Sequence, residues 1–303
     1  MKMIIDTDPG VDDAIAIALA HALATVDLIG LTTVFGNTFV DQSSRNARYL
    51  CDLLGITIPV AAGASLPYGA DSYVPSANVH GPEGFGAITK VPQIGQDASE
   101  TAAQFLVRCA AEHKGELVIC AIGPLTNIAD AVALDPDFAS NLGRLVIMGG
   151  AFECAGNITP RAEANIWHDP IAADAVFAAG FEIVMVGLNA TMKTLLTPGQ
   201  FTKLASQSPE VGGFLNKISG FYLDFYRSVG VTDGCPMHDA LAVLACTDID
   251  RFTLHRCGIS IGQSGENTGA TLADANRPAV SIAMDVQADW AVETMMQMIG
   301  NLD

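Results

Sequence analysis

The chain has 303 residues, half of them hydrophobic, a composition that excludes a disordered protein and is ordinary for one large α/β domain. It carries 33 Asp and Glu against 15 Lys and Arg, for a formal net charge of −18 at pH 7. Such an acidic surface repels phosphate backbones and anionic lipid headgroups, so we expect no nucleic-acid partner and no membrane partner.

The N-terminus and the cysteines both indicate a cytoplasmic protein. The opening residues, MKMIIDTD, introduce charge before an apolar signal-peptide core can form. The seven cysteines are scattered, odd in number and free of any Cys-x-x-Cys pair, and several lie inside apolar runs. This usage is typical of buried, reduced thiols in a reducing compartment.

Short apolar runs alternate with helical stretches along the first two thirds of the chain, which predicts βα units around a sheet. Each run is apolar nearly throughout, as expected when helices cover both faces of a parallel sheet. We expect strands at 3–5, 28–34, 58–61, 117–122, 145–148 and 183–186, and helices at 13–24, 42–54, 100–113, 125–134 and 170–179. The predicted fold class is α/β: a single domain with a largely parallel, mixed central sheet flanked by helices, in an open Rossmann-like topology.

The alternation weakens after Thr197, and we expect residues 197–303 to form a helical and β sub-lobe that completes the active site. Its predicted helices lie at 209–227, 238–245 and 288–299, and its strands at 252–261, 270–272 and 280–284. No linker-like Gly/Ser run separates it from the rest, so residues 1–303 are expected to form one domain. The irregular stretch 66–90 is typical of a functional lid.

Four carboxylates, those of Asp6, Asp8, Asp12 and Asp13, gather in eight residues where the first strand ends. In a doubly wound sheet, ligands bind at this carboxyl edge. Pro9-Gly10 predicts a turn, with Asp12 as the N-cap of the following helix and Asp6 as a supporting hydrogen-bond acceptor. Capping explains one or two acids but not four, because like charges about 4 Å apart repel by roughly 4 kcal/mol at an effective dielectric of 20. The cluster therefore predicts a Ca²⁺ or Mg²⁺ site.

Six motifs in order along nearly the whole chain resemble those of the inosine–uridine-preferring nucleoside hydrolases. The first is the Asp-Thr-Asp-Pro-Gly-Val-Asp-Asp run at 6–13. The others are TVFGN at 33–37, VHG at 79–81, AIGPLTN at 121–127, LVIMGG at 145–150 with GNITPRAEAN at 156–165, and MHD at 237–239. The resemblance implies a nucleoside-hydrolase-like fold and hydrolysis of the N-glycosidic bond of ribonucleosides to ribose and a free purine or pyrimidine base.

The resemblance also implies a metal-activated water. Asp8, Asp13, Asp239 and the backbone carbonyl of Ile122 match the Ca²⁺ ligands of the family, and Asp8 matches the base that takes the proton of the water. The chemistry of the ligands alone permits Mg²⁺ as well as Ca²⁺.

The ribose-binding residues implied by the resemblance carry amide and carboxylate groups, which suit vicinal hydroxyls because amides both donate and accept hydrogen bonds. Asp12 matches the position that holds the 2′-hydroxyl. The other matching positions are Asn37, Asn157, Glu163 and Asn165.

For the leaving base, His238 matches the proposed general acid of the base-nonspecific branch of the family, and imidazole titrates near neutrality. The nearby Phe-Tyr-Arg-Ser run at 225–228 resembles that branch, which makes Tyr226 a partner of the base or of His238. His80 is expected either to lie in a mobile loop over the site or to make a loop hydrogen bond. The resemblance further implies a homodimer or homotetramer and a part in nucleoside salvage.

Two other interpretations of the acid cluster stay open at this stage. An Asp-x-Asp at the first strand end also marks the Mg²⁺-dependent phosphatases of the haloacid dehalogenase type, although the expected downstream Lys and acid pair do not stand out. A Ca²⁺-dependent nucleoside- or ribose-binding protein without catalysis is the second alternative, which leaves the presence of Asp8, His238 and Asp239 unexplained.

Overall fold

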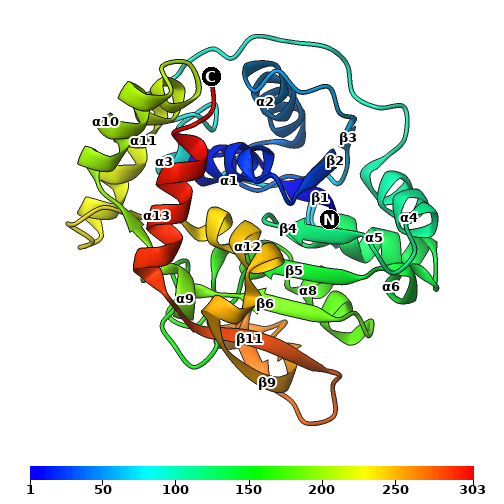
Figure 1. Ribbon diagram of the computed structural model, residues 1–303. Coiled ribbons are helices and arrows are strands. Elements are labelled where there is room, and N and C mark those ends of the chain that lie inside the picture. Colours follow the sequence, from blue (N-terminus) through cyan, green and yellow to red (C-terminus); the bar gives the residue numbers. More distant parts are fainter.

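A nine-stranded sheet forms the centre of the computed structural model, which describes residues 1–303 (Figure 1). The strand order is β10-β9-β11-β6-β5-β4-β1-β2-β3, and every pair from β11 to β3 is parallel, whereas β9 pairs antiparallel with both β10 and β11. The strands of this sheet are β1 (Lys2–Thr7), β2 (Asp27–Thr33), β3 (Val60–Ala62), β4 (Val118–Ala121), β5 (Arg144–Met148), β6 (Ile183–Val186), β9 (Phe252–Ile261), β10 (Thr271–Ala273) and β11 (Ala279–Val286).

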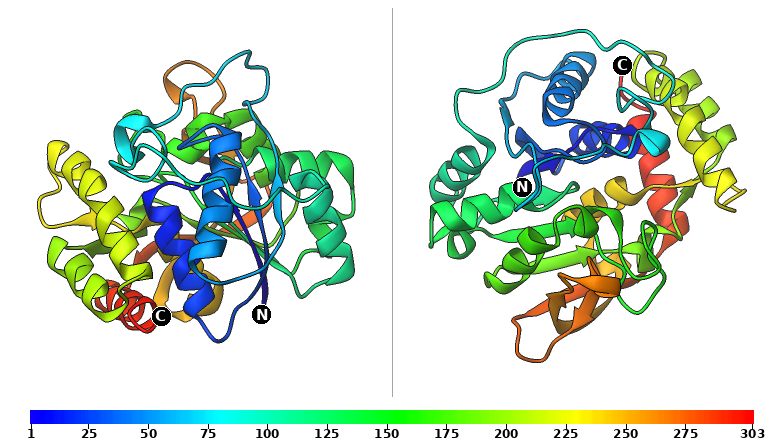
Figure 2. Two further views of the ribbon diagram at one scale, coloured as in Figure 1. Left: turned by 90° about the horizontal axis from the view of Figure 1, so that it is seen from above. Right: turned by 180° about the vertical axis from the view of Figure 1, so that it is seen from behind.

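Helices cover both faces of the sheet, as the two views of Figure 2 show. The longer helices are α1 (Val11–Ala22), α2 (Val40–Leu53), α4 (Ala102–Glu112), α5 (Thr126–Leu134), α8 (Pro170–Ala178), α10 (Pro198–Gln207), α11 (Val211–Ser228), α12 (His238–Thr247) and α13 (Ala288–Ile299). The short ones are α3 (Ala77–His80), α6 (Phe138–Asn141), α7 (Ala164–His168) and α9 (Leu188–Thr191), together with the 3₁₀ turns η1 (Ile249–Arg251) and η2 (Gly265–Asn267). A separate small sheet joins β7 (Leu195–Leu196) to β8 (Cys235–Pro236).

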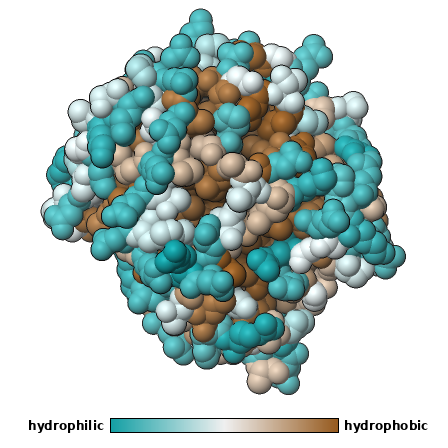
Figure 3. All heavy atoms as spheres, viewed as in Figure 1, coloured by the Kyte–Doolittle hydropathy of each residue, from teal (hydrophilic) through white to brown (hydrophobic).

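The alternation of side chains along the buried strands divides the interior into two cores. Met3 and Ile5 of β1 pack with α1, α11, α12 and α13, whereas Ile4 faces the opposite core with α4, α5 and α8. Both faces of β1 are fully buried, which explains the continuous apolar run in the sequence. Hydrophilic side chains predominate around the outline of the molecule in Figure 3, and apolar atoms are visible toward its centre.

The structure confirms the predicted α/β fold class and every predicted strand and helix, each with ends within two residues of those expected. The sequence did not reveal α10, the short helices or the β7–β8 pair. All seven cysteines are free and five are buried, but Cys154 is exposed and Cys257 is only partly buried, contrary to the expectation of buried thiols. None of the helices is both long and apolar enough to span a membrane.

β1 is the point where the direction of the chain through the sheet reverses, because β1 pairs with β2 on one side and with β4 on the other. The loops after these strands diverge at such a point and leave a crevice at the carboxyl ends. The acid cluster at 6–13 begins inside β1 with Asp6 and continues through the turn into α1, so it lies at this crevice.

Candidate active site

The turn between β1 and α1 differs from the expected one in its first helical residue. Helix α1 begins at Val11 with Gly10 at the N-cap, so the prediction of Asp12 as N-cap was wrong. The carboxylate of Asp13, at the third helical position, instead accepts a hydrogen bond from the Gly10 N–H at 2.9 Å. A side chain at position 10 has no space, because its Cβ would lie 2.4 Å from Nδ1 of His80. Because Asp12 is not the N-cap, its side chain is available to line the crevice.

Asp13 is the most strongly hydrogen-bonded member of the acid cluster. Its Oδ1 accepts from the Thr7 hydroxyl at 2.5 Å and from the Asp8 N–H at 3.2 Å. Its Oδ2 accepts from the side-chain amide of Asn37 at 3.0 Å as well as from Gly10. These donors favour an ionised carboxylate in a fixed orientation although the side chain is fully buried.

Asp8 has one oxygen engaged and one unpaired. Oδ2 accepts the backbone N–H of Asn37 at 2.6 Å, whereas the buried Oδ1 has no hydrogen-bond partner. A Cβ at Gly36 or Gly123 would lie 1.8 and 2.7 Å from these two carboxylate oxygens, so the two glycines allow the chain to close around Asp8. Burial and the neighbouring Asp13 raise the pKa of Asp8 well above its ordinary value.

Asp6 lies behind the cluster as a support, as expected. Its Oδ1 accepts hydrogen bonds from the Thr32 hydroxyl at 2.5 Å and from the Asn127 amide at 2.7 Å. Burial raises the pKa of Asp6 to about 7.

Helix α12 brings a further carboxylate, that of Asp239, to the cluster by packing against α1. One oxygen each of Asp12, Asp13 and Asp239 lie within 4.8 Å of one another, and all three side chains are buried. Burial and repulsion from the neighbouring aspartates raise the pKa of Asp239 well above its ordinary value. Asp12, which the sequence assigned to ribose, belongs to this closest group, and Asp8 does not.

The oxygen atoms of the acid cluster fit a hard divalent cation. The candidate ligands are all oxygens, two of them, Asp8 Oδ1 and Asp12 Oδ1, are buried without hydrogen-bond donors, and no Lys or Arg lines the adjacent cavity to balance the charge. Ile122, after β4, lines the same cavity, and its carbonyl oxygen accepts a hydrogen bond from the Asn165 amide. The backbone and carboxylate oxygens together are the ligand type that Ca²⁺ and Mg²⁺ prefer.

A cavity of about 520 Å³ opens in front of the cluster and has a polar and an apolar part. Asp8 and Asp13 do not line it and lie behind it. The predicted site residues that line it are Asp12, Asn37, His80, Ile122, Asn157, Glu163, Asn165, Tyr226, His238 and Asp239. Its apolar wall is formed by Val79, Met148, Ile158, Met192, Phe225, Val229 and Val231. A cavity of this size and mixed lining is typical of a site for a small polar molecule with one apolar end.

The predicted ribose-binding residues after β5 are each held in place by hydrogen bonds. The Glu163 carboxylate caps α7 and accepts the backbone N–H groups of Gly150, Asn165 and Ile166 at 2.9–3.2 Å. The Asn165 amide donates to the Ile122 carbonyl at 2.9 Å, and the Asn157 side-chain oxygen accepts from the backbone of Ala164 at 3.0 Å. All three residues line the cavity.

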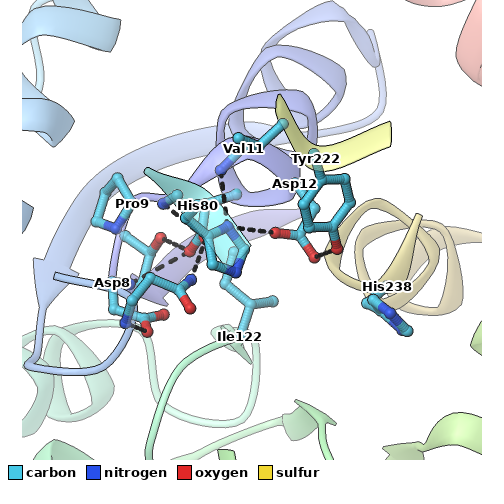
Figure 4. A network of polar contacts seen from close by, with 12 residues as sticks. Asp8, Pro9, Val11, Asp12, His80, Ile122, Tyr222 and His238 are labelled. Carbon is cyan, nitrogen blue, oxygen red and sulfur yellow. Dashed lines mark hydrogen bonds and ion pairs between the residues drawn. The ribbon is translucent and has the colours of Figure 1, made fainter. Parts of the chain in front are cut away.

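His80 ends the short helix α3 and lies between Asp8 on one side and Asp12 with Tyr222 on the other (Figure 4). Its Nδ1 accepts the Val11 N–H at 3.2 Å and lies 3.7 Å from Oδ1 of Asp12. Burial lowers the pKa of His80 to about 3. The hydrogen bond to Val11 is a contact of the kind that one of the two expectations gave, and His80 also lines the cavity. The mobility of its segment stays a prediction.

His238, the first residue of α12, belongs to a chain of polar contacts that crosses the cavity wall. Its Nε2 lies 2.6 Å from the Tyr226 hydroxyl and its Nδ1 lies 2.8 Å from the Thr191 hydroxyl. The Tyr222 hydroxyl lies 3.5 Å from that of Tyr226 and donates to Oδ2 of Asp12 at 3.0 Å. Burial lowers the pKa of His238 to about 4, so its resting imidazole is neutral at pH 7.

Sequence reasoning missed two members of this chain of contacts, Tyr222 and Thr191. Tyr222 lies one helical turn before Tyr226 on α11, and this i, i+4 spacing is the signal that could have revealed it. Thr191 had no such signal, because it lies in a four-residue helix after β6.

The sequence model of the inosine-uridine preferring nucleoside hydrolase family matches residues 3–293. The chain belongs to this family. Probable uridine nucleosidase 2 of Arabidopsis thaliana is 39% identical, and the match covers 98% of this nucleoside hydrolase and 97% of the plant protein. Non-specific ribonucleoside hydrolase RihC of Klebsiella pneumoniae is 37% identical, over 97% of this chain and 98% of its own. A solved structure, the Purine-Preferring Ribonucleoside Hydrolase from Gardnerella vaginalis, matches at a TM-score of 0.95 and 32% identity, over 100% and 99% of the two chains.

The family match and these relatives show that this nucleoside hydrolase is an enzyme that hydrolyses the N-glycosidic bond of ribonucleosides. They set aside the haloacid-dehalogenase-type phosphatase and the catalytically inactive binding protein. The family is metal-dependent, and the acidic cluster of this nucleoside hydrolase is able to bind a metal ion. The structural neighbour shares the single-domain, mostly parallel α/β fold.

Proposed function

We propose that this enzyme hydrolyses both purine and pyrimidine ribonucleosides with the help of Ca²⁺. The observation that carries the proposal is one cavity with the unpaired Oδ1 of Asp12, beside the acid cluster, at one end and a hydrogen-bonded His–Tyr pair with apolar side chains at the other. The range of relatives supports a broad specificity, since their names cover uridine, purine and non-specific hydrolysis.

The proposed Ca²⁺ ligands are carboxylate oxygens of Asp8, Asp13 and Asp239 and the carbonyl oxygen of Ile122. Their burial and mutual repulsion support this assignment, because they leave negative charge that only a cation or protons can balance. When bound, a divalent cation supplies a water molecule of lowered pKa at this end of the cavity.

Asp8 is the proposed general base. Its Oδ2 is held by the Asn37 N–H, so Oδ1, which has no donor, is the atom that accepts the proton of the attacking water. Any side chain at Gly36 or Gly123 would clash with this carboxylate, so the two glycines leave the space that it occupies.

The ribose is proposed to lie between the acid cluster and the group of residues after β5. Asp12 accepts from the 2′-hydroxyl through Oδ1, since Oδ2 is occupied by Tyr222. Asn37, Asn157, Glu163 and Asn165 hold the other hydroxyls and orient the sugar, which gains positive charge as the glycosidic bond breaks.

His238 is proposed to protonate the leaving base through Nε2, with Tyr226 as its hydrogen-bonded partner and His80 near the base. Negative charge that develops on the departing base favours the protonated imidazole, which offsets the effect of burial. The apolar wall around Phe225 and Val229 accepts the flat base without selecting its hydrogen-bonding edge.

The experiment compares Asp8→Asn and His238→Gln on inosine, uridine and p-nitrophenyl riboside, whose leaving group needs no proton. Asp8→Asn is expected to lower kcat by about 10³-fold on all three substrates. His238→Gln is expected to lower kcat by about 10²-fold on the nucleosides and little on the nitrophenyl riboside. Asp52→Asn changes an exposed carboxylate and serves as the control. Equal losses on all substrates for His238→Gln would contradict its role as acid.

We further propose that residues 197–303, which carry Tyr222, Tyr226, His238 and Asp239, are the part of the single domain that completes the site. A homodimer or homotetramer, a cytoplasmic location and a part in nucleoside salvage belong to the same proposal. Size-exclusion chromatography with light scattering tests the first of these, and a monomer in solution would contradict it.

A further inference from the structure

The imidazole of His238 is held at both of its nitrogens by buried hydroxyl groups. Nε2 meets the Tyr226 hydroxyl at 2.6 Å on the cavity side, and Nδ1 meets the Thr191 hydroxyl at 2.8 Å on the protein side. We propose that Thr191 is a positioning residue for the reaction: it anchors Nδ1 of His238 and so holds the imidazole with Nε2 toward the cavity. This inference rests on the proposed function of His238 as acid.

The fold fixes the position of Thr191 next to His238. Its side chain is fully buried, and the Thr191 hydroxyl has no hydrogen-bond partner other than Nδ1 of His238. Helix α9 follows β6 through Gly187, where a Cβ would lie 2.4 Å from the carbonyl of Gly150, so the chain turns there at close range. Three residues after Thr191, the Thr194 carbonyl accepts the N–H of Met237, the residue before His238. The two segments are therefore fixed together by backbone and side chain.

A hydroxyl suits this position because it can both donate and accept a hydrogen bond. The resting imidazole is neutral, so the proton that it delivers is first taken up from solvent water. In the resulting imidazolium, Nδ1–H donates to Thr191 Oγ1 and Nε2–H points to the Tyr226 hydroxyl at the cavity wall. When the Nε2 proton passes to the base, the imidazole is left neutral with Nδ1–H still bonded to Thr191. The proton count of the ring changes at Nε2 alone, and the ring does not rotate between the two states. An orienting group of this kind on the far nitrogen is what general acid–base histidines require.

Two substitutions of Thr191 separate positioning from packing. Thr191→Val keeps the shape of the side chain and removes the hydroxyl, and Thr191→Ser keeps the hydroxyl. Thr194→Val is the matched control, because Thr194 is equally buried in the same segment and its hydroxyl has no partner. Each variant is assayed in saturating Ca²⁺ with inosine and with p-nitrophenyl riboside.

Thr191→Val is expected to lower kcat on inosine by about 10- to 100-fold with little change in KM, and to leave the nitrophenyl riboside nearly unaffected. Thr191→Ser is expected to recover most of the activity, and Thr194→Val to retain all of it. Equal losses on both substrates, or full activity of Thr191→Val on inosine, would overturn the proposal.

A spectroscopic readout keeps this test separate from that of the proposed function. Long-range ¹H–¹⁵N spectra of histidine-labelled enzyme distinguish the protonated from the unprotonated ring nitrogen, and the His238→Gln spectrum assigns the signal of His238. The wild type and Thr194→Val are expected to show one tautomer of His238, and Thr191→Val a mixture. A single unchanged tautomer in Thr191→Val would refute the anchoring role even if His238 is the acid. If His238→Gln loses activity equally on both substrates, the proposed function fails instead, whatever the spectra show.

Discussion

The hydroxyl of Tyr222 donates a hydrogen bond to Oδ2 of Asp12 at 3.0 Å and so connects α11 to the first turn of α1, 210 residues earlier in the chain. Both side chains are buried, and Asp12 has no other side-chain hydrogen-bond donor at that oxygen. This contact joins the end of the cavity proposed for ribose to the Tyr226–His238 pair proposed for the base.

Tyr222→Phe and Tyr226→Phe are expected to impair the enzyme in different ways. Tyr222→Phe leaves the buried Asp12 carboxylate without its donor, at a cost of about 1.5–3 kcal/mol, so we expect KM to rise about tenfold or more for every riboside. Tyr226→Phe removes the partner of His238 and is expected to lower kcat on inosine while sparing p-nitrophenyl riboside. Steady-state kinetics of the two variants check this. Identical changes of KM and kcat in both would contradict separate roles of Tyr222 in ribose binding and of Tyr226 in protonation of the base.

Chelation of divalent cations is expected to lower both stability and activity. The carboxylates of Asp8, Asp12, Asp13 and Asp239 are buried together, so the metal-free protein carries repulsion that a bound cation relieves. A ligand at 100 times its Kd stabilises the folded state by about 2.7 kcal/mol. We therefore expect a Tm several degrees higher in millimolar Ca²⁺ than in EGTA, measured by scanning calorimetry. Mg²⁺ in the same assay tests the choice of ion, and the same Tm in EGTA, Ca²⁺ and Mg²⁺ would exclude a metal site.

Nucleoside 5′-phosphates are expected to be poor substrates. Asp12, Glu163 and Asp239 line the cavity and no Lys or Arg does, and a pair of like unit charges 8 Å apart repels by about 2 kcal/mol at an effective dielectric of 20. We expect kcat/KM for AMP to be at least about 100-fold below that for adenosine. 5′-Methylthioadenosine, which is neutral but also substituted at the 5′ position, is the control. If AMP and the methylthio compound are hydrolysed equally slowly, size and not charge sets the limit.

His168 is expected to make the enzyme sensitive to acid. Burial lowers the pKa of His168 from 6.5 to about 4, and its Nδ1 has no hydrogen-bond partner. The unfolded chain therefore binds the proton at higher pH than the folded chain, and stability falls as the pH drops from about 6.5 to about 4. The shift corresponds to about 3 kcal/mol at most.

Thermal unfolding between pH 7.5 and 4.5 checks this contribution. His168→Gln is expected to lose less of its Tm on acidification than the wild type, and His255→Gln, which replaces an exposed imidazole, is expected to follow the wild type. Parallel curves for the wild type and His168→Gln would show that His168 plays no part.

The strands and longer helices were predictable because their patterns are local. The apolar run Met3–Ile5 has to be a strand covered on both faces, and the acids that follow it fall at the carboxyl edge of a parallel sheet. The position of β9 and β10 at the sheet edge was not predictable, because strand order depends on contacts between distant segments.

The details of the site were less predictable than its location. The Asp8 and Asp12 carboxylates look alike in the sequence, and only the packing of α12 decides that Asp12, Asp13 and Asp239 form the closest group. The prediction of Asp12 as N-cap failed because the helix begins earlier, and the Asp13 carboxylate, at the third helical position, accepts the backbone N–H of Gly10. Tyr222 and Thr191 resemble ordinary core residues until their hydroxyl partners are seen in three dimensions.

The packing of α12 against α1 also bears on how the protein is made. The acids of the first turn of α1 are synthesised early, whereas Asp239 and His238 lie on a helix that emerges only after most of the chain. Until that helix reaches α1, the early carboxylates lack Asp239, one of the proposed cation ligands. A nascent chain, or one truncated before residue 238, thus has the acids of α1 but lacks both Asp239 and the proposed acid His238. Hydrolytic activity is therefore expected only from chains that have been synthesised beyond α12.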